Sequence, residues 1–424
     1  MGAVLVVAAC GTNASSASPS SAATPSPATS AAPTALPSPS VAPSPSAASA
    51  LDAIYDTVEQ QVIGIRGLQP TKPVARQFIT PAEAKAMLAK DFDTETPAAY
   101  LAGSERLYKA LGLIPAGSSL RDLTIDLLGG AVAAFYRDVE GKLYVITKSG
   151  QPGPAERFYF AHEYDHALQD QNSTIFKDQR DVYDQGDRLL ARQAIYEGDA
   201  TLLMTQWAAA NLNQSELLEV LSAGNDPEGQ AVLDRTPAIL KDTLTFPYTT
   251  GLTYVQAAQA AGGWPTVNAF FKTMPESTEQ ILHPGKYTAH EAPLKVELPA
   301  DLATRLGAGW TVPIQDTFGE FQLGLWLRES GVDPQAARDA AAGWGGDRLA
   351  VVEGPDGAWA VAMQTAWDTD ADAAAFEKAA STAIKKATGD AHVLPGAGGK
   401  TRWVLIANDA KTSGKVAGAL GLAG

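Results

Sequence analysis

Two regions of different pattern predict an α+β protein. In the first, helical patterns surround one β-hairpin at 133–146, and in the second, from about residue 316, strands joined by a tight turn alternate with helices. The chain has 424 residues, of which 45% are hydrophobic, which is enough for two hydrophobic cores. We therefore expect a folded body at 51–315 and a small α+β domain of unknown role at 316–424.

The first ten residues, 1–10, resemble the end of a bacterial lipoprotein signal. An apolar run, too short to cross a bilayer, leads into Val-Ala-Ala-Cys at Cys10. The signal would be cleaved before Cys10 and lipid attached to it, although no positively charged region precedes the run. A chance cysteine is the alternative. The resemblance implies a surface lipoprotein of a bacterium, outside the cytoplasm and touching the membrane only through this anchor.

The next segment, residues 11–50, consists almost entirely of Ser, Ala, Pro and Thr, without a charged side chain. Such a composition cannot bury a core, so we expect a disordered tether. The whole chain carries a net charge of −15, which argues against nucleic acid or an anionic membrane surface as a partner. Cys10 is the only cysteine, so no disulfide can form within the chain. We expect a monomer.

The body should open with helices that lead to the hairpin. Thr80, followed by Pro-Ala-Glu, is a strong start signal for a helix. Gly129 and Gly130 should end the last of these helices, and Gly141 should lie in the hairpin turn. The expected elements are helices at 51–68, from 81, at 97–113 and at 120–128, with a strand at 74–79.

An H-E-x-x-H pattern at 162–166 lies in a helix expected at 154–171. Residues four apart share one face of a helix, so His162 and His166 can direct two imidazoles at one metal ion. Glu163 lies about 100° further round the helix, where it can act as a general base beside the metal. A chance pair of core histidines is the alternative, although the chain has only five histidines.

A catalytic zinc site needs a third protein ligand. The helix expected at 186–207 interrupts its apolar residues with Glu-Gly-Asp-Ala at 197–200. The glycine costs helix propensity, which is explained if Glu197 faces a cation and the small residues let the two helices approach closely. An exposed glutamate beside a packing glycine is the alternative. The sequence thus predicts one Zn²⁺ per chain, bound by His162, His166 and Glu197.

This pattern resembles the gluzincin, or thermolysin-like, zinc metallopeptidases. The resemblance covers about residues 120–210 and implies a zincin-like fold, in which the hairpin, the two ligand helices and a helical lobe build the site. The fuller pattern, HEYDHALQDQ followed by EGDA, resembles a poorly characterised group of secreted bacterial proteins. Glu197 lies further from the second histidine than the corresponding glutamate of thermolysin-like enzymes, and its Tyr-Glu-Gly-Asp-Ala setting differs from theirs.

Further residues are candidates around the metal. Asp170, one helical turn after His166, and Asp199, beside Glu197, are candidates to fix the imidazole tautomers by hydrogen bonding. Either aspartate could instead be solvated or cap a loop. The resemblance also makes the first hairpin strand the edge that pairs with the substrate backbone, at Ala134, Phe135 and Tyr136.

The lobe after residue 207 is helical in pattern and ends in a short segment at 277–287. Gluzincins use a His or Tyr to stabilise the oxyanion opposite the zinc, and His283 is a candidate for this role. A helix-end histidine bonded to its own carbonyls is the open alternative. The expected helices of the lobe lie at 216–223, 237–244, 252–261 and 264–272.

The C-terminal domain carries no motif that points to chemistry, and the chain lacks a P-loop, a GxGxxG, a CxxC and a nucleophile elbow. Its strands should meet at a Gly-Pro-Asp-Gly turn at 354–357. The expected elements are helices at 318–328, 370–386 and 409–420, with strands at 348–353, 358–367 and 401–407.

Together these features predict a zinc metallopeptidase acting on a peptide or protein substrate. Glu163 would take the proton of the attacking water and deliver it to the leaving amine. Two alternatives stay open: a zinc-binding surface lipoprotein without turnover, serving as a scaffold or binding module, and a hydrolase of a non-peptide amide or ester. The presence of Glu163 favours turnover, because zinc binding alone does not require it.

Overall fold

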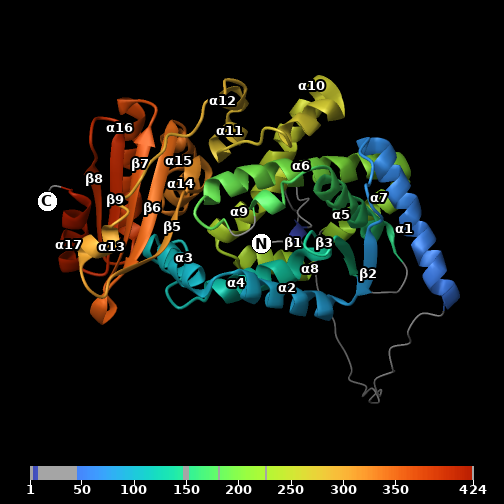
Figure 1. Cartoon of the computed structure of the whole chain (residues 1–424), viewed down its shortest axis with the longest axis horizontal. Coiled ribbons are helices and arrows are strands. Elements are labelled where there is room, and N and C mark those ends of the chain that lie inside the picture. Colours follow the sequence, from blue (N-terminus) through green and yellow to red (C-terminus); the bar gives the residue numbers. More distant parts are fainter. Residues whose placement is uncertain (1–2, 8–44, 147–151, 180–181, 225–226, 423–424) are drawn as a thin grey trace, which may run out of the picture.

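The computed structural model describes residues 3–7, 45–146, 152–179, 182–224 and 227–422. It contains a helical body with a four-stranded sheet and a C-terminal domain built on a five-stranded sheet (Figure 1). The α+β class is confirmed. Cys10 and most of the predicted tether lie outside the described residues.

The first elements agree closely with the sequence pattern. Thr80 caps α2 through a capping box, in which its side chain accepts from the Glu83 amide while Glu83 accepts from the Thr80 amide at 2.7 Å. Two differences concern boundaries, because α1 starts inside the predicted tether and α4 continues through Gly129 and Gly130. The elements are α1 (Pro45–Arg66), β2 (Ala75–Ile79), α2 (Pro81–Glu95), α3 (Ala98–Ala110) and α4 (Leu120–Ala131).

The body sheet has the order β1-β3-β4-β2 and contains the predicted hairpin. Strands β3 (Val132–Arg137) and β4 (Lys142–Ile146) pair antiparallel, with Gly141 in the turn at a φ of 60°. β2 joins β4 in parallel.

The first hairpin strand is not the edge of this sheet. The prediction that Ala134, Phe135 and Tyr136 form an edge that pairs with the substrate backbone is therefore wrong for the chain as described. Strand β1 (Ala3–Val7) pairs antiparallel with β3 on that side, with Leu5 opposite Phe135 and Val4 opposite Tyr136. The Ala-Val-Leu-Val-Val segment has high β-propensity, and pairing satisfies the backbone groups that an open edge would expose.

The two predicted ligand helices form the centre of the body. Helix α5 (Pro154–Asn172) is buried on all sides over most of its length, packed between the sheet, α1 and α6 (Gly186–Asn211). Such a helix has no solvated face, which explains why apolar and polar residues alternate along it without a helical stripe. The following segment forms one short 3₁₀ turn, η1 (Lys177–Gln179).

The lobe after α6 is helical, as expected, with several short elements that the pattern did not indicate. A π-helical turn, η2, separates two of its helices. The non-helical Gly262 and Gly263 divide α10 into the two expected helices. The elements are α7 (Gln214–Gly224), α8 (Pro227–Arg235), α9 (Ala238–Phe246), η2 (Pro247–Gly251), α10 (Leu252–Phe270), α11 (Thr278–Leu282), α12 (Pro284–Thr288) and α13 (Leu302–Leu306).

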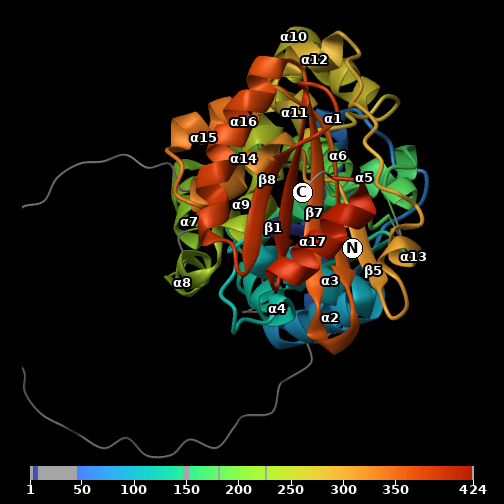
Figure 2. The same ribbon diagram turned by 90° about the vertical axis from the view of Figure 1, so that its left-hand side faces the viewer.

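The C-terminal domain is an antiparallel sheet in the order β5-β6-β7-β9-β8 with helices on both faces (Figure 2). Val351 points to the face covered by α14, α15 and α16, whereas Ala350 and Val352 point to the face covered by α13 and α17. The elements are β5 (Thr311–Asp316), α14 (Gly319–Glu329), α15 (Pro334–Ala341), β6 (Trp344–Glu353), η3 (Pro355–Gly357), β7 (Trp359–Trp367), α16 (Asp370–Ala383), η4 (Ile384–Lys386), β8 (Asp390–Pro395), β9 (Thr401–Ala407) and α17 (Ala410–Leu420).

The domain boundary predicted between residues 315 and 316 cuts through β5, so it has to move towards the N-terminus. β5 pairs with β6, and α13 packs on the same sheet domain through Leu302 and Leu306. The sequence Thr-Val-Pro-Ile-Gln-Asp of β5 gave no strand signal, because Pro is disfavoured within strands and the segment is half polar. An edge strand tolerates such a sequence.

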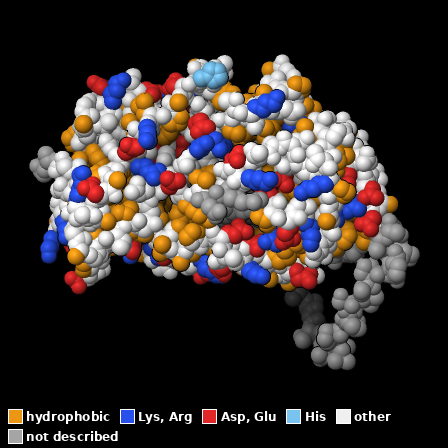
Figure 3. Space-filling view, in the orientation of Figure 1, with side chains coloured by type: hydrophobic (Ala, Val, Ile, Leu, Met, Phe, Trp, Pro, Cys, Tyr) orange, Lys and Arg blue, Asp and Glu red, His pale blue; other side chains and the backbone are white. Residues whose placement is uncertain are grey.

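No helix in the described part of the chain is long and apolar enough to cross a membrane. Acidic and basic side chains are interspersed over the face of the molecule shown in Figure 3.

Candidate metal centre

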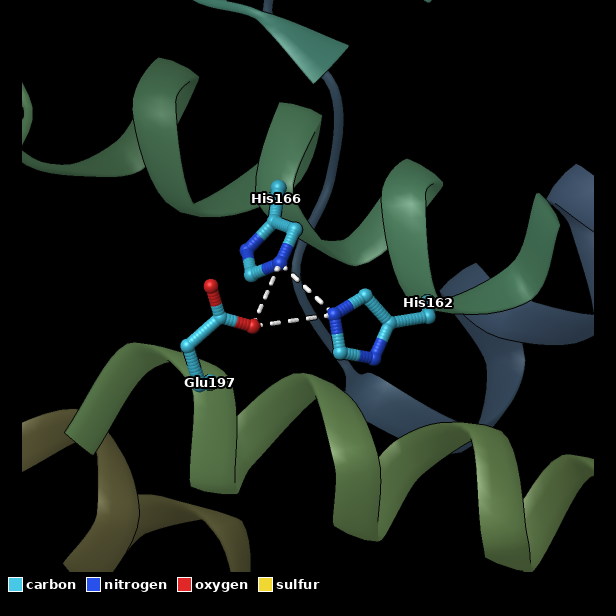
Figure 4. A group of neighbouring side chains, drawn as sticks. All are labelled: His162, His166 and Glu197. Atoms are coloured by element: carbon cyan, nitrogen blue, oxygen red, sulfur yellow. Dashed lines mark hydrogen bonds and ion pairs between the residues drawn. The ribbon is translucent and has the colours of Figure 1, made fainter. Parts of the chain in front are cut away.

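Three predicted ligand side chains converge in the space between α5 and α6 (Figure 4). His162 and His166 lie one turn apart on the same face of α5, with their Nε2 atoms 2.9 Å apart. Glu197 reaches across from α6, and its Oε2 lies 3.1 Å from the Nε2 of His162 and 3.4 Å from that of His166. All three side chains are fully buried.

This donor set fits a zinc ion. Two imidazole nitrogens and one carboxylate oxygen are the ligands that zinc prefers, and Zn–N distances of about 2.0–2.1 Å place tetrahedral donors roughly 3.3 Å apart. The three distances between the donor atoms lie close to that value. A buried carboxylate also needs a compensating positive charge, which a bound cation would provide.

The two imidazoles differ in their electrostatics. Burial, reinforced by the charge of His166, lowers the pKa of His162 to about 4. Burial also acts to lower the pKa of His166, but Glu197, Glu163 and Gln169 outweigh it and raise that pKa to about 9. The cluster therefore favours one positive charge near Glu197.

Glu163 lies beside these ligands and is anchored by the hairpin. The backbone N–H of Tyr136 in β3 donates to Glu163 Oε2 at 2.7 Å, while Oε1 has no hydrogen-bond partner among the described residues. Burial raises the pKa of Glu163 well above its usual range. A divalent cation nearby would counteract that shift and favour the carboxylate.

The two aspartates predicted to fix the imidazoles contact other groups. Asp170 Oδ2 accepts from the Tyr136 hydroxyl at 2.7 Å, and Asp199 Oδ2 accepts from Arg66. Neither forms a hydrogen bond to an imidazole, so this prediction is wrong. The residue that meets His166 is Gln169, whose Oε1 lies 2.8 Å from Nδ1. Residues three apart on a helix are neighbours, so position 169 could have been considered alongside 170.

Tyr248 is a residue of the centre that the sequence did not indicate. It lies in η2, its ring packs parallel to His162 with centroids 6.1 Å apart, and its side chain is buried. Its hydroxyl makes no hydrogen bond of normal geometry to a described residue. Burial, then Glu197 and Glu163, raise the pKa of Tyr248 well above its usual range, so the hydroxyl keeps its proton.

Two glycines, Gly198 and Gly251, allow Tyr248 to lie beside His162. A Cβ added at Gly198 would lie 2.5 Å from the carbonyl oxygen of Gly251, and one added at Gly251 would collide with the Ala194 carbonyl. The glycine of the Glu-Gly-Asp-Ala sequence thus lets η2 approach α6. The sequence predicts that small residues here let α5 and α6 pack closely. Gly198 instead packs against Gly251 of η2, so that prediction named the wrong partner.

His283 is not part of the centre. Its Nε2 lies 2.8 Å from Glu320 of the C-terminal domain, and 43% of its side chain is exposed. The three ligand side chains group without it, and no described contact supports the oxyanion role predicted for His283. A short helix followed by Pro284 directs it towards α14 instead.

A mostly apolar cavity of about 380 Å³ lies beside the centre, between the early helices, α6 and α9. Phe176 and Tyr196 line it, and their ring centroids lie 6.2 and 6.0 Å from that of His166. Asp138 is the only charged residue among the described residues of its lining. The cavity therefore suits an uncharged, apolar group.

A second acidic cluster, far along the chain, already surrounds the ammonium of a lysine. Glu279, Glu291 and Asp368 surround Lys286, whose Nζ lies 2.6, 2.7 and 2.6 Å from their oxygens. The ammonium occupies the position that a cation would take, so the cluster ties α11 and α12 to the C-terminal domain.

Comparison with known proteins reaches only the C-terminal part. A family model described as a domain of unknown function (DUF8575) matches residues 306–417, a range that includes β5 and excludes the metal centre. No match was found among curated proteins or among solved structures. The chain thus combines a C-terminal domain similar to that family with a body characterised by its own geometry.

Proposed function

We propose that the protein is a zinc-dependent peptidase of the gluzincin type with a zincin-like body. The observation that carries this proposal is the buried convergence of His162, His166 and Glu197, with Glu163 beside them. Burying four ionisable side chains together costs free energy that a purely structural core would avoid. Glu163 lies next to the two helical histidines but is not one of the three ligands. Its presence supports hydrolysis rather than metal storage.

The steps of hydrolysis would be shared among zinc, Glu163 and Tyr248. When bound, the zinc supplies Lewis-acid polarisation of a carbonyl and lowers the pKa of a water molecule. Glu163, held through Oε2 by the Tyr136 amide, accepts the proton of the attacking water on Oε1 and delivers it to the leaving amine. The Tyr248 hydroxyl donates a hydrogen bond to the substrate oxygen as negative charge develops there.

Substrate binding follows from the cavity beside the centre. The cavity lined by Phe176 and Tyr196 would take an apolar side chain next to the scissile bond. The lipid on Cys10 would hold the enzyme outside the cytoplasmic membrane.

The Glu163→Gln variant tests this function. It keeps size and most hydrogen bonding but removes the base, so one zinc per chain should remain while peptide hydrolysis falls about 10²–10⁴-fold. Zinc is measured by elemental mass spectrometry and cleavage by a peptide library with and without a chelator. Glu156→Gln, in the first turn of the same helix, is the matched control and should leave both unchanged.

Other outcomes distinguish the alternatives. Unchanged hydrolysis by Glu163→Gln would contradict the mechanism. A wild-type protein that holds zinc but cleaves no peptide would support a scaffold, and cleavage confined to esters or non-peptide amides would support the other hydrolase.

A further inference from the structure

Gln169 occupies a special position in α5, one turn beyond His166. Its side chain is 1% exposed, and its Oε1 lies 2.8 Å from His166 Nδ1. Its amide nitrogen faces three acceptors: the Tyr196 carbonyl at 3.0 Å, Asp199 Oδ2 at 3.0 Å and Asp165 Oδ2 at 3.2 Å. Both ends of the amide are therefore engaged in the interior of the body.

These neighbours allow only one orientation of the Gln169 amide. The NH₂ group has to face the two carboxyl groups and the carbonyl, because the reverse orientation would direct Oε1 at three acceptors. Oε1 then faces His166 and can only accept, so His166 Nδ1 carries the hydrogen. In the neutral imidazole that a metal ion requires, the lone pair is then on Nε2, the atom that points at His162 and Glu197.

A buried guanidinium fixes the two aspartates. Arg66, at the C-terminal end of α1, is fully buried; its Nη2 lies 2.8 Å from Asp199 Oδ2 and its Nε lies 3.5 Å from Asp165 Oδ1. Its guanidinium also lies 4.6 Å from the ring centroid of Trp264. Without this cation, two adjacent carboxyl groups would lose the charge that balances them.

We propose that Gln169 is a positioning residue that fixes the tautomer and orientation of His166, and that Arg66, Asp165 and Asp199 fix Gln169 in turn. The inference rests on the proposed metal centre, which it deepens. It assigns a role to the aspartate within H-E-Y-D-H and to the aspartate of Glu-Gly-Asp-Ala. His162 has no comparable support, because its Nδ1 lacks a hydrogen-bond partner among the residues described.

Zinc affinity of Gln169→Leu tests the inference. This variant keeps the buried volume but removes the acceptor, and loss of such a partner typically weakens metal binding about 10–100-fold. Affinity is measured by competition with a chromophoric chelator at fixed pH on the full chain. Gln171→Leu is the matched control, because Gln171 accepts from the amides of Thr71 and Lys72 at 2.7 and 2.9 Å and does not meet His166.

A second readout reports the tautomer directly. Histidine-labelled wild-type protein should show a slowly exchanging Nδ1–H of His166 by NMR, with or without zinc, and Gln169→Leu should lose it. Gln169→Glu keeps an acceptor for this hydrogen, so it should retain the signal and bind zinc more tightly than Gln169→Leu. If the leucine variant fails to fold, the His166 Nδ1–H signal of Gln169→Glu, compared with that of wild type, decides the matter.

Two results would overturn the assignment: wild-type zinc affinity in Gln169→Leu, or a His166 Nδ1–H signal that is the same in all variants. Wild-type protein that holds no zinc would instead contradict the proposed function. The His166 signal of that metal-free protein would still test the role of Gln169.

Discussion

The two parts of the molecule bury different kinds of side chain. Helix α5 and its neighbour α6 bury His162, Glu163, His166 and Glu197 without measurable exposure, whereas β6 and β7 bury mainly Val, Leu and Ala. Burial of apolar side chains stabilises a fold, but burial of ionisable groups costs free energy unless they are paired. This difference indicates that burial in the C-terminal domain serves stability, and it supports the metal-dependent function that we propose for the body.

Two buried polar sites, one in each part, also differ in how their atoms are hydrogen-bonded. Asp347 of the C-terminal domain is buried but accepts from the amides of Phe318 and Gly319 and from the indole of Trp344, at 2.8, 2.8 and 2.9 Å. In the body, His162 Nδ1, Glu163 Oε1 and Glu197 Oε1 have no partner among the described residues. Buried polar atoms without a partner are rare in structural cores and are expected where a ligand binds.

The variant with the greatest effect should change the metal centre of the body and leave the C-terminal domain unaffected. His166→Ala should abolish stoichiometric zinc binding, because two ligands remain where three converge. Elemental mass spectrometry should find one zinc in the wild-type chain and none in the variant, and the thermal stabilisation by added zinc should disappear. His392→Ala is the control, since this exposed histidine pairs with Asp390 far from the centre. One zinc per chain in a His162→Ala and His166→Ala double variant would show that the site lies elsewhere.

Leu349→Ala should have a smaller effect, confined to the stability of the C-terminal domain. Leu349 in β6 is fully buried under α14 and α16, so its truncation should cost about 2–5 kcal/mol of the free energy of unfolding. Chemical denaturation measures this loss, and zinc content should stay at one per chain. Lys378→Ala, an exposed change on α16, should alter stability by less than about 0.5 kcal/mol. A Leu349→Ala variant that loses zinc would show that the two parts are not independent.

The smallest effect concerns Asp187, at the junction of the two parts. Burial, with nearby Asp347 and Glu279, raises the pKa of Asp187 to about 8, although hydrogen bonds from Thr278 act against the shift. A carboxyl group whose pKa is raised on folding stabilises the fold fully below its unfolded pKa, and this contribution is lost as the pH rises through about 8.

Asp187→Asn removes this titration. The fall in melting temperature between pH 5 and pH 8 should be smaller in the variant than in wild type, by on the order of 2–4 °C. Calorimetry at a series of pH values measures the difference. Equal slopes for the two proteins would mean that Asp187 is ionised in the folded protein at all these pH values.

Local patterns predicted much of the body. The spacing of His162 and His166, the capping box at Thr80 and the hairpin turn at Gly141 each depend on residues a few positions apart, so the sequence suffices for them. Glu197 needed one further step, because a carboxylate next to a mid-helix glycine suggests an inward role.

Other features depend on contacts between distant residues. Tyr248 reaches His162 only because Gly251 packs against Gly198, and no local signal marks that pairing. Gln169 rather than Asp170 meets His166, since a helix offers neighbours at both three and four positions and tertiary packing selects one. β1 pairs with a strand that lies far along the chain, and β5 is a polar edge strand, so periodicity indicated neither.

The close contact of Gly198 with Gly251 has a consequence for recognising relatives of this chain. Any larger residue at either position would separate η2 from α6 and withdraw Tyr248 from His162. A search for proteins with the same centre should therefore require a discontinuous signature: H-E-x-x-H followed by Gln three positions later, Glu-Gly-Asp, and a Tyr three residues before a Gly. Chains that share only the first of these would be expected to build a different pocket beside the two histidines.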